Sequence, residues 1–160
     1  MVTESTSART PGKPVKVLVY SDDRNIRARV TMALGIRPDE TLPPLDFVEC
    51  ATQPAALDQL DTGTIDLAIL DGEAVPSGGI GLCRQLKDEI FQAPPVLVLM
   101  GRPQDAWLAT WARADAVVAH PVNPFELTEK SVALLRRRLA AGRSTAPGDK
   151  DTADGDLSRT

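Results

Sequence analysis

The chain alternates short apolar runs with segments of helical period, and this alternation constrains its fold more than any other feature. The runs are rich in Val, Leu and Ile without regular polar alternation, which is typical of strands buried on both faces of a parallel sheet. They are residues 15–20, 45–50, 67–70, 96–100 and 116–119. Between them, apolar side chains recur every three or four residues, as in helices with one buried stripe. The pattern predicts a three-layer α/β domain with right-handed crossovers.

The predicted strands and helices all fall within residues 14–142 of a 160-residue chain. Residues 1–13 and 143–160 consist mostly of Ser, Thr, Asp, Gly, Pro and charged residues, with few apolar side chains to bury. Segments of this composition do not form a packed structure alone. We therefore expect one domain, residues 14–142, between two flexible tails.

The charge and apolar content of the chain argue against two classes of partner. The formal net charge is −4 and the pI is about 5.0, whereas DNA-binding proteins usually present a basic stripe. No segment approaches the roughly 18 apolar residues that span a bilayer, and the N-terminus has no apolar run. The isolated Cys50 and Cys83 lack metal-ligand spacing, which favours free thiols. We expect a cytoplasmic protein that binds no nucleic acid and does not insert directly into a membrane.

Acidic residues follow two of the predicted strands. Asp22 and Asp23 come after the first strand, and Asp71 comes after the third. Parallel strands in the order 2-1-3-4-5 would bring these carboxylates together at the edge of the sheet where such folds bind ligands. Mg²⁺ between them would relieve their mutual repulsion. The alternative is that Asp22 and Asp23 only cap the following helix, and the residues alone leave both interpretations open.

Four separate blocks stand out along the chain: VKVLVYSDDRNIR, DLAILDGEAVPSGGIGLCRQL, PPVLVLM and ADAVVAHPVNPFEL. In order and spacing they resemble the signature blocks of bacterial response-regulator receiver domains, over about residues 14–141. The resemblance implies a flavodoxin-like (βα)5 fold with a five-stranded parallel sheet. It also implies Mg²⁺ held by acidic residues, and phosphotransfer from a histidine kinase to an aspartate.

Matched residue by residue, the resemblance implies that Asp71 is the phosphoacceptor and Asp22 a direct metal ligand. Glu73 stands where the family offers a backbone carbonyl to the metal. Ser21, however, replaces the second acidic residue after the first strand. We therefore expect any Mg²⁺ at Asp22, Asp71 and Glu73 to bind weakly, and no cofactor to be required.

Three further positions depart from the family's switch. Met100 replaces a Thr or Ser, Val117 replaces an aromatic residue, and His120 replaces the Lys that pairs with the phosphoryl group. Pro121 and Gly79 keep their family places. Each hydrogen bond to a charged group contributes about 1.5 to 3 kcal/mol, whereas family switching relies on about 1 to 3 kcal/mol of coupling. Loss of the hydroxyl and the ammonium therefore predicts that phosphorylation would bias this domain little.

Two tryptophans lie close together in a chain with only 4% aromatic residues. Trp107 and Trp111 are four residues apart and share one face of the predicted fourth helix. They either fill the core, as large aromatics often do, or form a surface for a protein partner in a region that receivers use for partners. Arg136, Arg137 and Arg138, if apposed to the tryptophans, would favour an acidic partner.

These features support two functional hypotheses. The first is an atypical, stand-alone pseudo-receiver that acts as a phosphorylation-independent adaptor or as an accessory subunit of a larger assembly. The alternative is a working single-domain receiver or phosphorelay carrier that a histidine kinase phosphorylates on Asp71. The sequence has no Gly-rich phosphate loop, metal-binding His cluster or nucleophile–base pair, so we expect no enzymatic activity. We expect no output domain after residue 142, so that any effect on transcription would pass through a partner.

Overall fold

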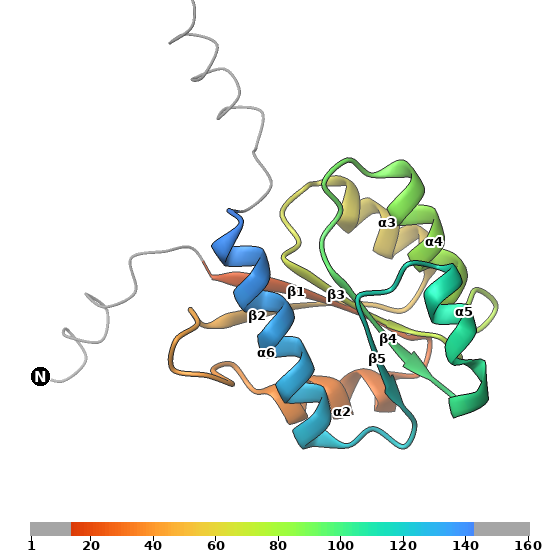
Figure 1. Ribbon diagram of the computed structural model, residues 1–160, viewed down its shortest axis with the longest axis horizontal. Helices are drawn as coiled ribbons and strands as arrows, with labels where there is room; N and C mark the ends of the chain where they lie inside the picture. The colour runs from red at the N-terminus through yellow and green to blue at the C-terminus, as the bar shows by residue number, and fades with distance from the viewer. Residues whose placement is uncertain (1–13, 143–160) are drawn as a thin grey trace, which may run out of the picture.

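The computed structural model describes residues 14–142, and both predicted tails lie outside the described residues. Strands and helices alternate along this part of the chain (Figure 1). The elements are β1 (Val15–Tyr20), α2 (Arg24–Leu34), β2 (Leu45–Cys50), α3 (Gln53–Asp61), β3 (Leu67–Asp71), α4 (Gly79–Glu89), β4 (Val96–Met100), the 3-10 turn η1 (Pro103–Asp105), α5 (Ala106–Trp111), β5 (Ala116–Ala119) and α6 (Pro124–Ala140). All five predicted strands are present, and β3 extends one residue further than predicted, to Asp71.

The five strands form one parallel sheet in the order β2-β1-β3-β4-β5, which confirms the predicted topology. In its register, Val17 of β1 pairs with Phe47 of β2 on one side and with Leu67 of β3 on the other. Because β1 and β3 are neighbours, their carboxyl ends meet at the same edge of the sheet. This arrangement brings the residues after β1 next to Asp71.

Helices cover both faces of the sheet and complete the three layers (Figure 1). On one face, the side chains beneath α3, α4 and α5 include Leu18, Leu70 and Val98. On the other face, the core beneath α2 and α6 includes Val19 and Ile69. Successive residues of a strand point to opposite faces, so strands covered on both sides are apolar throughout.

No helix within residues 14–142 has the length and apolar character needed to cross a membrane.

Helix α6 is fixed both at its start and against the outer strand. The Asn123 side chain accepts hydrogen bonds from the backbone N–H groups of Phe125, at 2.8 Å, and Glu126, at 3.1 Å. One turn further along, Lys130 Nζ pairs with the Glu126 carboxylate at 3.0 Å and donates to the backbone carbonyl of Val117 in β5 at 2.6 Å. Lys130 therefore ties α6 to the last strand of the sheet.

Candidate functional site

A pocket of about 360 Å³ opens at the edge of the sheet where the strands end. The segments that follow β1, β3, β4 and β5 all contribute residues to it. Its lining consists of Asp22, Asp23, Ile26, Asp71, Glu73, Val75, Gly101 and His120. The acidic residues that follow two different strands in the sequence therefore meet in one place, together with the histidine that follows β5.

Asp71 is the last residue of β3 and is only 3% exposed. Its Oδ2 accepts a hydrogen bond from the Ser21 hydroxyl at 2.7 Å, and its Oδ1 accepts one from the backbone N–H of Glu73 at 2.9 Å. His120 Nε2 lies 3.4 Å from Oδ1 and adds a charge pair only when the imidazole is protonated. Both oxygens of the expected phosphoacceptor are thus engaged within the domain.

Ser21 is fully buried and connects three parts of the site. Its hydroxyl donates to Asp71 and also accepts the backbone N–H of Asp23 at 3.0 Å. Its carbonyl accepts a hydrogen bond from Arg27 of α2 at 2.7 Å, and Arg27 also pairs with Glu49 at 3.1 Å. Sequence reasoning identified Ser21 only as a missing carboxylate and did not identify Arg27. Arg27 lies six residues after Ser21 in a run with several arginines, and nothing in that run distinguishes it.

The other acidic side chains of the pocket are engaged by backbone N–H groups. Asp22 Oδ1 accepts from Val75, in the loop after β3, at 3.0 Å. Asp23 caps α2, as one of the two sequence interpretations predicts, while Asp22 does not. The Glu73 carboxylate extends to the end of β4, where its Oε2 accepts the N–H of Gly101 at 3.1 Å. The carboxylates therefore fix the loops that surround the pocket.

The donor set does not fit the metal site that the family resemblance implies. Mg²⁺ binds carboxylate oxygens in nearly ideal octahedral geometry, and here one of the two carboxylates expected after β1 is a serine. That serine donates to Asp71 Oδ2, so one oxygen of this carboxylate is already engaged within the domain. Within residues 14–142, no group of three or more His, Cys, Asp or Glu side chains is placed to hold a metal ion.

Tyr20, at the end of β1, forms a hydrogen bond to the loop between β3 and α4. Its hydroxyl donates to the Ser77 carbonyl at 2.5 Å. Burial, together with the negative charges of Asp22 and Asp71, raises the pKa of Tyr20 above its ordinary value. The phenol therefore stays protonated as a donor, and it holds the loop that closes one side of the pocket.

The altered switch positions divide between the core and the pocket. Met100 is 2% exposed and belongs to the apolar layer beneath α3, α4 and α5, against which the half-buried Val117 also packs. His120 lies at the pocket, where its backbone N–H donates to the Met100 carbonyl at 2.8 Å. Met100 thus places an apolar side chain in the core at the position where the family has a hydroxyl.

Both tryptophans of α5 lie on the surface, so the alternative that they fill the core is wrong. Trp107 is 65% exposed and Trp111 is 50% exposed. The Arg84 guanidinium of α4 lies 4.7 Å from the centre of the Trp111 ring and donates to the Trp111 carbonyl at 2.7 Å. This contact joins residues 27 positions apart, which no spacing rule would have found.

The expectation that Arg136, Arg137 and Arg138 face the tryptophans is wrong. Helix α6 covers the face of the sheet opposite to α5 (Figure 1). Arg136 pairs with Asp39, in the loop before β2, at 2.7 Å. The three arginines are consecutive residues of α6, so their side chains point in different directions around the helix. They do not add charge to the surface formed by Trp107 and Trp111.

A parallel sheet of this strand order, with a buried aspartate at the end of its third strand inside an acidic pocket, defines a receiver domain. No family model matches the chain. It is 55% identical over 122 residues to an uncharacterized response regulatory protein of Mycobacterium tuberculosis, an alignment that covers 76% of this chain and 92% of that protein. The chain belongs to the response-regulator family.

More distant relatives share the domain and the fold. The chain is 31% identical over 129 residues to the response regulator MprA of a Mycobacterium species (strain KMS), covering 78% of this chain and 52% of MprA. A response-regulator receiver domain from Clostridium thermocellum has the same fold, with a TM-score of 0.67 at 21% identity, covering 79% of this chain and 98% of that one.

Proposed function

We propose that this receiver domain binds another protein without needing phosphate, as an adaptor or an accessory subunit of a larger cytoplasmic assembly. The hydrogen bond from Ser21 Oγ to Asp71 Oδ2 is the observation that carries the proposal. Ser21 stands where the family has a metal-binding carboxylate. Its neutral hydroxyl instead donates to Asp71, the residue expected to accept the phosphoryl group. The nearby carboxylates of Asp22 and Glu73 then repel an incoming phosphoryl group, because no lysine is among the described residues that line the pocket.

The route by which a phosphoryl group would change the surface is also altered. In the family, a hydroxyl after the fourth strand and an aromatic residue in the fifth respond to the phosphoryl group. Here Met100 has no hydrogen-bonding group for a phosphoryl oxygen, and both Met100 and Val117 pack against one apolar layer. A closely packed apolar layer has one favoured arrangement, which supports a domain with a single functional state.

The exposed face of α5 supplies the proposed binding surface. Trp107 and Trp111 present large apolar area to solvent, and Arg84 holds one side of the Trp111 ring in place. Tryptophan is enriched among the residues that dominate binding energy in protein interfaces. A rigid, half-exposed ring loses little conformational freedom when a partner covers it.

Phosphorylation with a small donor tests the inactive switch directly. The full chain is incubated with acetyl phosphate and Mg²⁺, and its intact mass is followed. We expect no phosphorylated form to accumulate, whereas a variant with Ser21→Asp, Met100→Thr and His120→Lys, checked by its melting curve for folding, should gain one phosphoryl group. Full phosphorylation of the wild type, lost in Asp71→Asn, would overturn the proposal.

Partner binding is tested with a matched pair of variants. We expect the tagged Asp71→Asn protein to retain the proteins that the wild type co-purifies from a lysate of its source, because the phosphate site is not required. The double variant Trp107→Ala and Trp111→Ala should lose them. Loss of the partners in Asp71→Asn, with the fold intact, would favour the alternative.

The alternative is a working receiver or phosphorelay carrier that a histidine kinase phosphorylates on Asp71. The position of His120 favours it, since a protonated imidazole 3.4 Å from Asp71 Oδ1 would lie close to a phosphoryl oxygen. This alternative predicts that the wild type gains one phosphoryl group from a small donor and that His120→Ala gains less. Equal phosphorylation of the wild type and His120→Ala, or none in either, counts against a role for His120 in it.

A further inference from the structure

A glutamate of one loop lies directly against a glycine of another at the rim of the acidic pocket. Glu73 is the second residue after β3, and Gly101 is the first residue after β4. Glu73 Oε2 accepts the Gly101 N–H at 3.1 Å. A Cβ added to Gly101 would lie 2.5 Å from the Glu73 carboxyl carbon and 2.7 and 2.8 Å from its two oxygens. The carboxylate therefore occupies the space that a side chain at position 101 would fill.

Glu73 is itself held in place by the loop that carries it. Its backbone N–H donates to Asp71 Oδ1 at 2.9 Å, and the N–H of Ala74 donates to the Asp71 carbonyl at 3.2 Å. The Val75 N–H then donates to Asp22 Oδ1 at 3.0 Å. Because Asp71 is buried at the end of β3, these bonds join the loop to the sheet. Glu73 thus reaches Gly101 from a fixed position.

The residues after Gly101 lead directly into the helix that carries both tryptophans. Residues 103–105 form η1, and α5 begins at Ala106. Within the described part of the chain, residues 102–105 make hydrogen bonds only along their own segment, as between the Asp105 N–H and the Arg102 carbonyl at 3.0 Å. The bond from Gly101 to Glu73 is therefore the last hydrogen bond to another element before α5 among residues 14–142.

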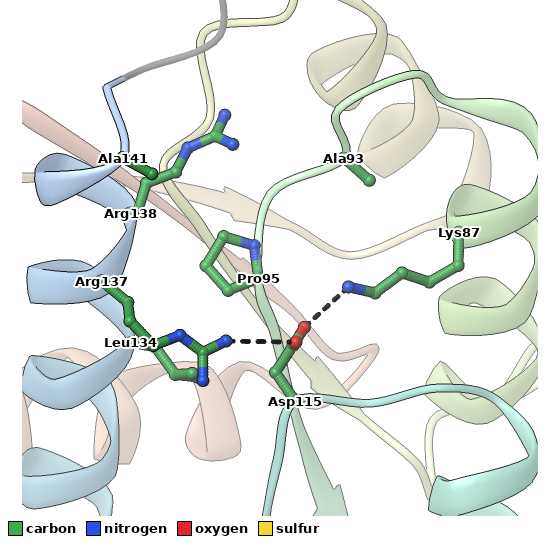
Figure 2. A pocket seen from close by; sticks show the side chains of 8 residues that line it. All are labelled: Lys87, Ala93, Pro95, Asp115, Leu134, Arg137, Arg138 and Ala141. Carbon is green, nitrogen blue, oxygen red and sulfur yellow. Dashed lines mark hydrogen bonds and ion pairs between the residues drawn. The ribbon is translucent and has the colours of Figure 1, made fainter.

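The other end of α5 is held by α4. Arg84 of α4 donates to the Trp111 carbonyl at 2.7 Å. Helix α4 is tied in turn to the start of β5, because Lys87 Nζ lies 2.7 Å from Asp115 Oδ2 (Figure 2). Helix α5 is thus fixed at its end by α4, whereas the hydrogen bond that fixes the chain before its start is the one at Gly101.

We propose that Glu73 is a positioning residue for the surface formed by Trp107 and Trp111. By holding Gly101, its carboxylate fixes the direction in which residues 102–105 leave the sheet, and with it the placement of α5. The inference rests on the proposed function, in which the two tryptophans contact a protein partner. A surface that is fixed before binding loses less conformational freedom when a partner covers it. Glu73 therefore serves partner binding without touching the partner.

Hydrogen exchange of the full chain, measured amide by amide, tests this role because it separates local opening from global unfolding. In Glu73→Ala we expect the amides of Gly101 and of α5 to exchange about tenfold faster, at the lower end of the effect of losing one hydrogen bond to a charged group. The amides of β1 and β3 should exchange as in the wild type. Glu73→Gln should restore slow exchange in α5, because the amide oxygen of glutamine still accepts the Gly101 N–H.

Two further variants test the contact itself. Gly101→Ala should reproduce the faster exchange of α5, since its Cβ displaces the carboxylate, and should add little when combined with Glu73→Ala. Asp22→Ala is the matched control, because it removes a carboxylate from the same pocket but one that binds Val75 in the loop after β3. We expect α5 in Asp22→Ala to exchange as in the wild type.

Unchanged exchange of α5 in Glu73→Ala would overturn the proposal. Equally faster exchange of all amides, in both Glu73→Ala and Glu73→Gln, would overturn it as well, because the side chain would then act on overall stability. Since no partner takes part in these measurements, either result leaves the proposed adaptor function unaffected. That function fails separately, if the double variant Trp107→Ala and Trp111→Ala keeps the partners of the wild type.

Discussion

The Ser21 hydroxyl donates to Asp71 Oδ2 across 2.7 Å and joins the residue after β1 to the last residue of β3. A serine hydroxyl has a single hydrogen to donate, so Asp71 takes all of its donor capacity. The Ser21 hydroxyl oxygen also accepts a hydrogen bond from the backbone N–H of Asp23, the residue that caps α2. One side chain thus fixes the acceptor carboxylate, the start of a helix and the neighbouring strand in a single arrangement.

Replacing this serine by an acid should restore metal binding. In Ser21→Asp, the new carboxylate faces that of Asp71, and the hydrogen bond that Asp71 accepted from the serine is lost. The repulsion between the two carboxylates should destabilise the fold without Mg²⁺, and Mg²⁺ should stabilise it. We expect the melting temperature of the variant to rise with millimolar Mg²⁺ and that of the wild type to stay constant. Ca²⁺ serves as a comparison of cation size. An equal rise in both proteins would contradict this account of the site.

Gly79 should not tolerate a side chain. A Cβ at this first residue of α4 would lie 2.8 Å from both the carbonyl carbon and the oxygen of Asp71, and backbone atoms cannot move aside cheaply. Gly79→Ala should therefore lose about 1 to 3 kcal/mol in free energy of unfolding. Gly81→Ala is the matched control, since no atom lies within 4 Å of its added Cβ, and alanine should stabilise α4 by up to about 1 kcal/mol. Urea unfolding measures both, and equal effects would refute the close approach.

The two tryptophans should differ in their effect on stability. Trp111→Ala removes the ring beneath the Arg84 guanidinium and should cost about 0.5 to 1 kcal/mol, as cation–π contacts at exposed sites do. Trp107→Ala, at a more exposed position, should stay within about 0.5 kcal/mol of the wild type. Thermal melts of the two variants test this order. A loss of about 3 kcal/mol or more in either would indicate a buried ring and contradict the surface placement.

The stability of the domain should fall at alkaline pH because of Cys83. Burial raises the pKa of this thiol to about 11 from an ordinary value of 9.0. Between these values the unfolded chain has released a proton that the folded domain retains, so unfolding becomes easier as the pH rises through the window. Urea unfolding at neutral pH and through the window should show this loss, with a flatter pH dependence in Cys83→Ala. Rapid alkylation of native Cys83 near pH 9 would contradict it.

Much of the fold follows from the apolar runs, because strands covered on both faces must be apolar along their whole length. The strand ends then identify the pocket, since the order of the sheet brings Asp22 and Asp71 together. Helical period indicates that Trp107 and Trp111 share a face, but it does not indicate whether solvent or the core lies against it. The same limit explains the error over Arg136, since the period of a helix does not specify which layer it joins.

The contacts that decide the chemistry join residues far apart in the chain. Ser21 and Asp71 are 50 positions apart, and their hydrogen bond depends on the register of β1 against β3. A sequence match scores Ser21 as a lost carboxylate, because it compares residue types and not the hydrogens they donate. The same holds for Arg27, whose contact with the Ser21 carbonyl is made through a backbone atom.

The bond from Lys130 to the Val117 carbonyl has a consequence for how copies of this protein meet. Strand β5 forms one border of the sheet, and a border strand offers backbone groups on which the strand of another molecule can assemble. The ammonium of Lys130 takes up one such carbonyl and places a positive charge beside it. An approaching strand would have to displace that ammonium before it could pair with this carbonyl, so the lysine disfavours edge-to-edge assembly at this point of β5.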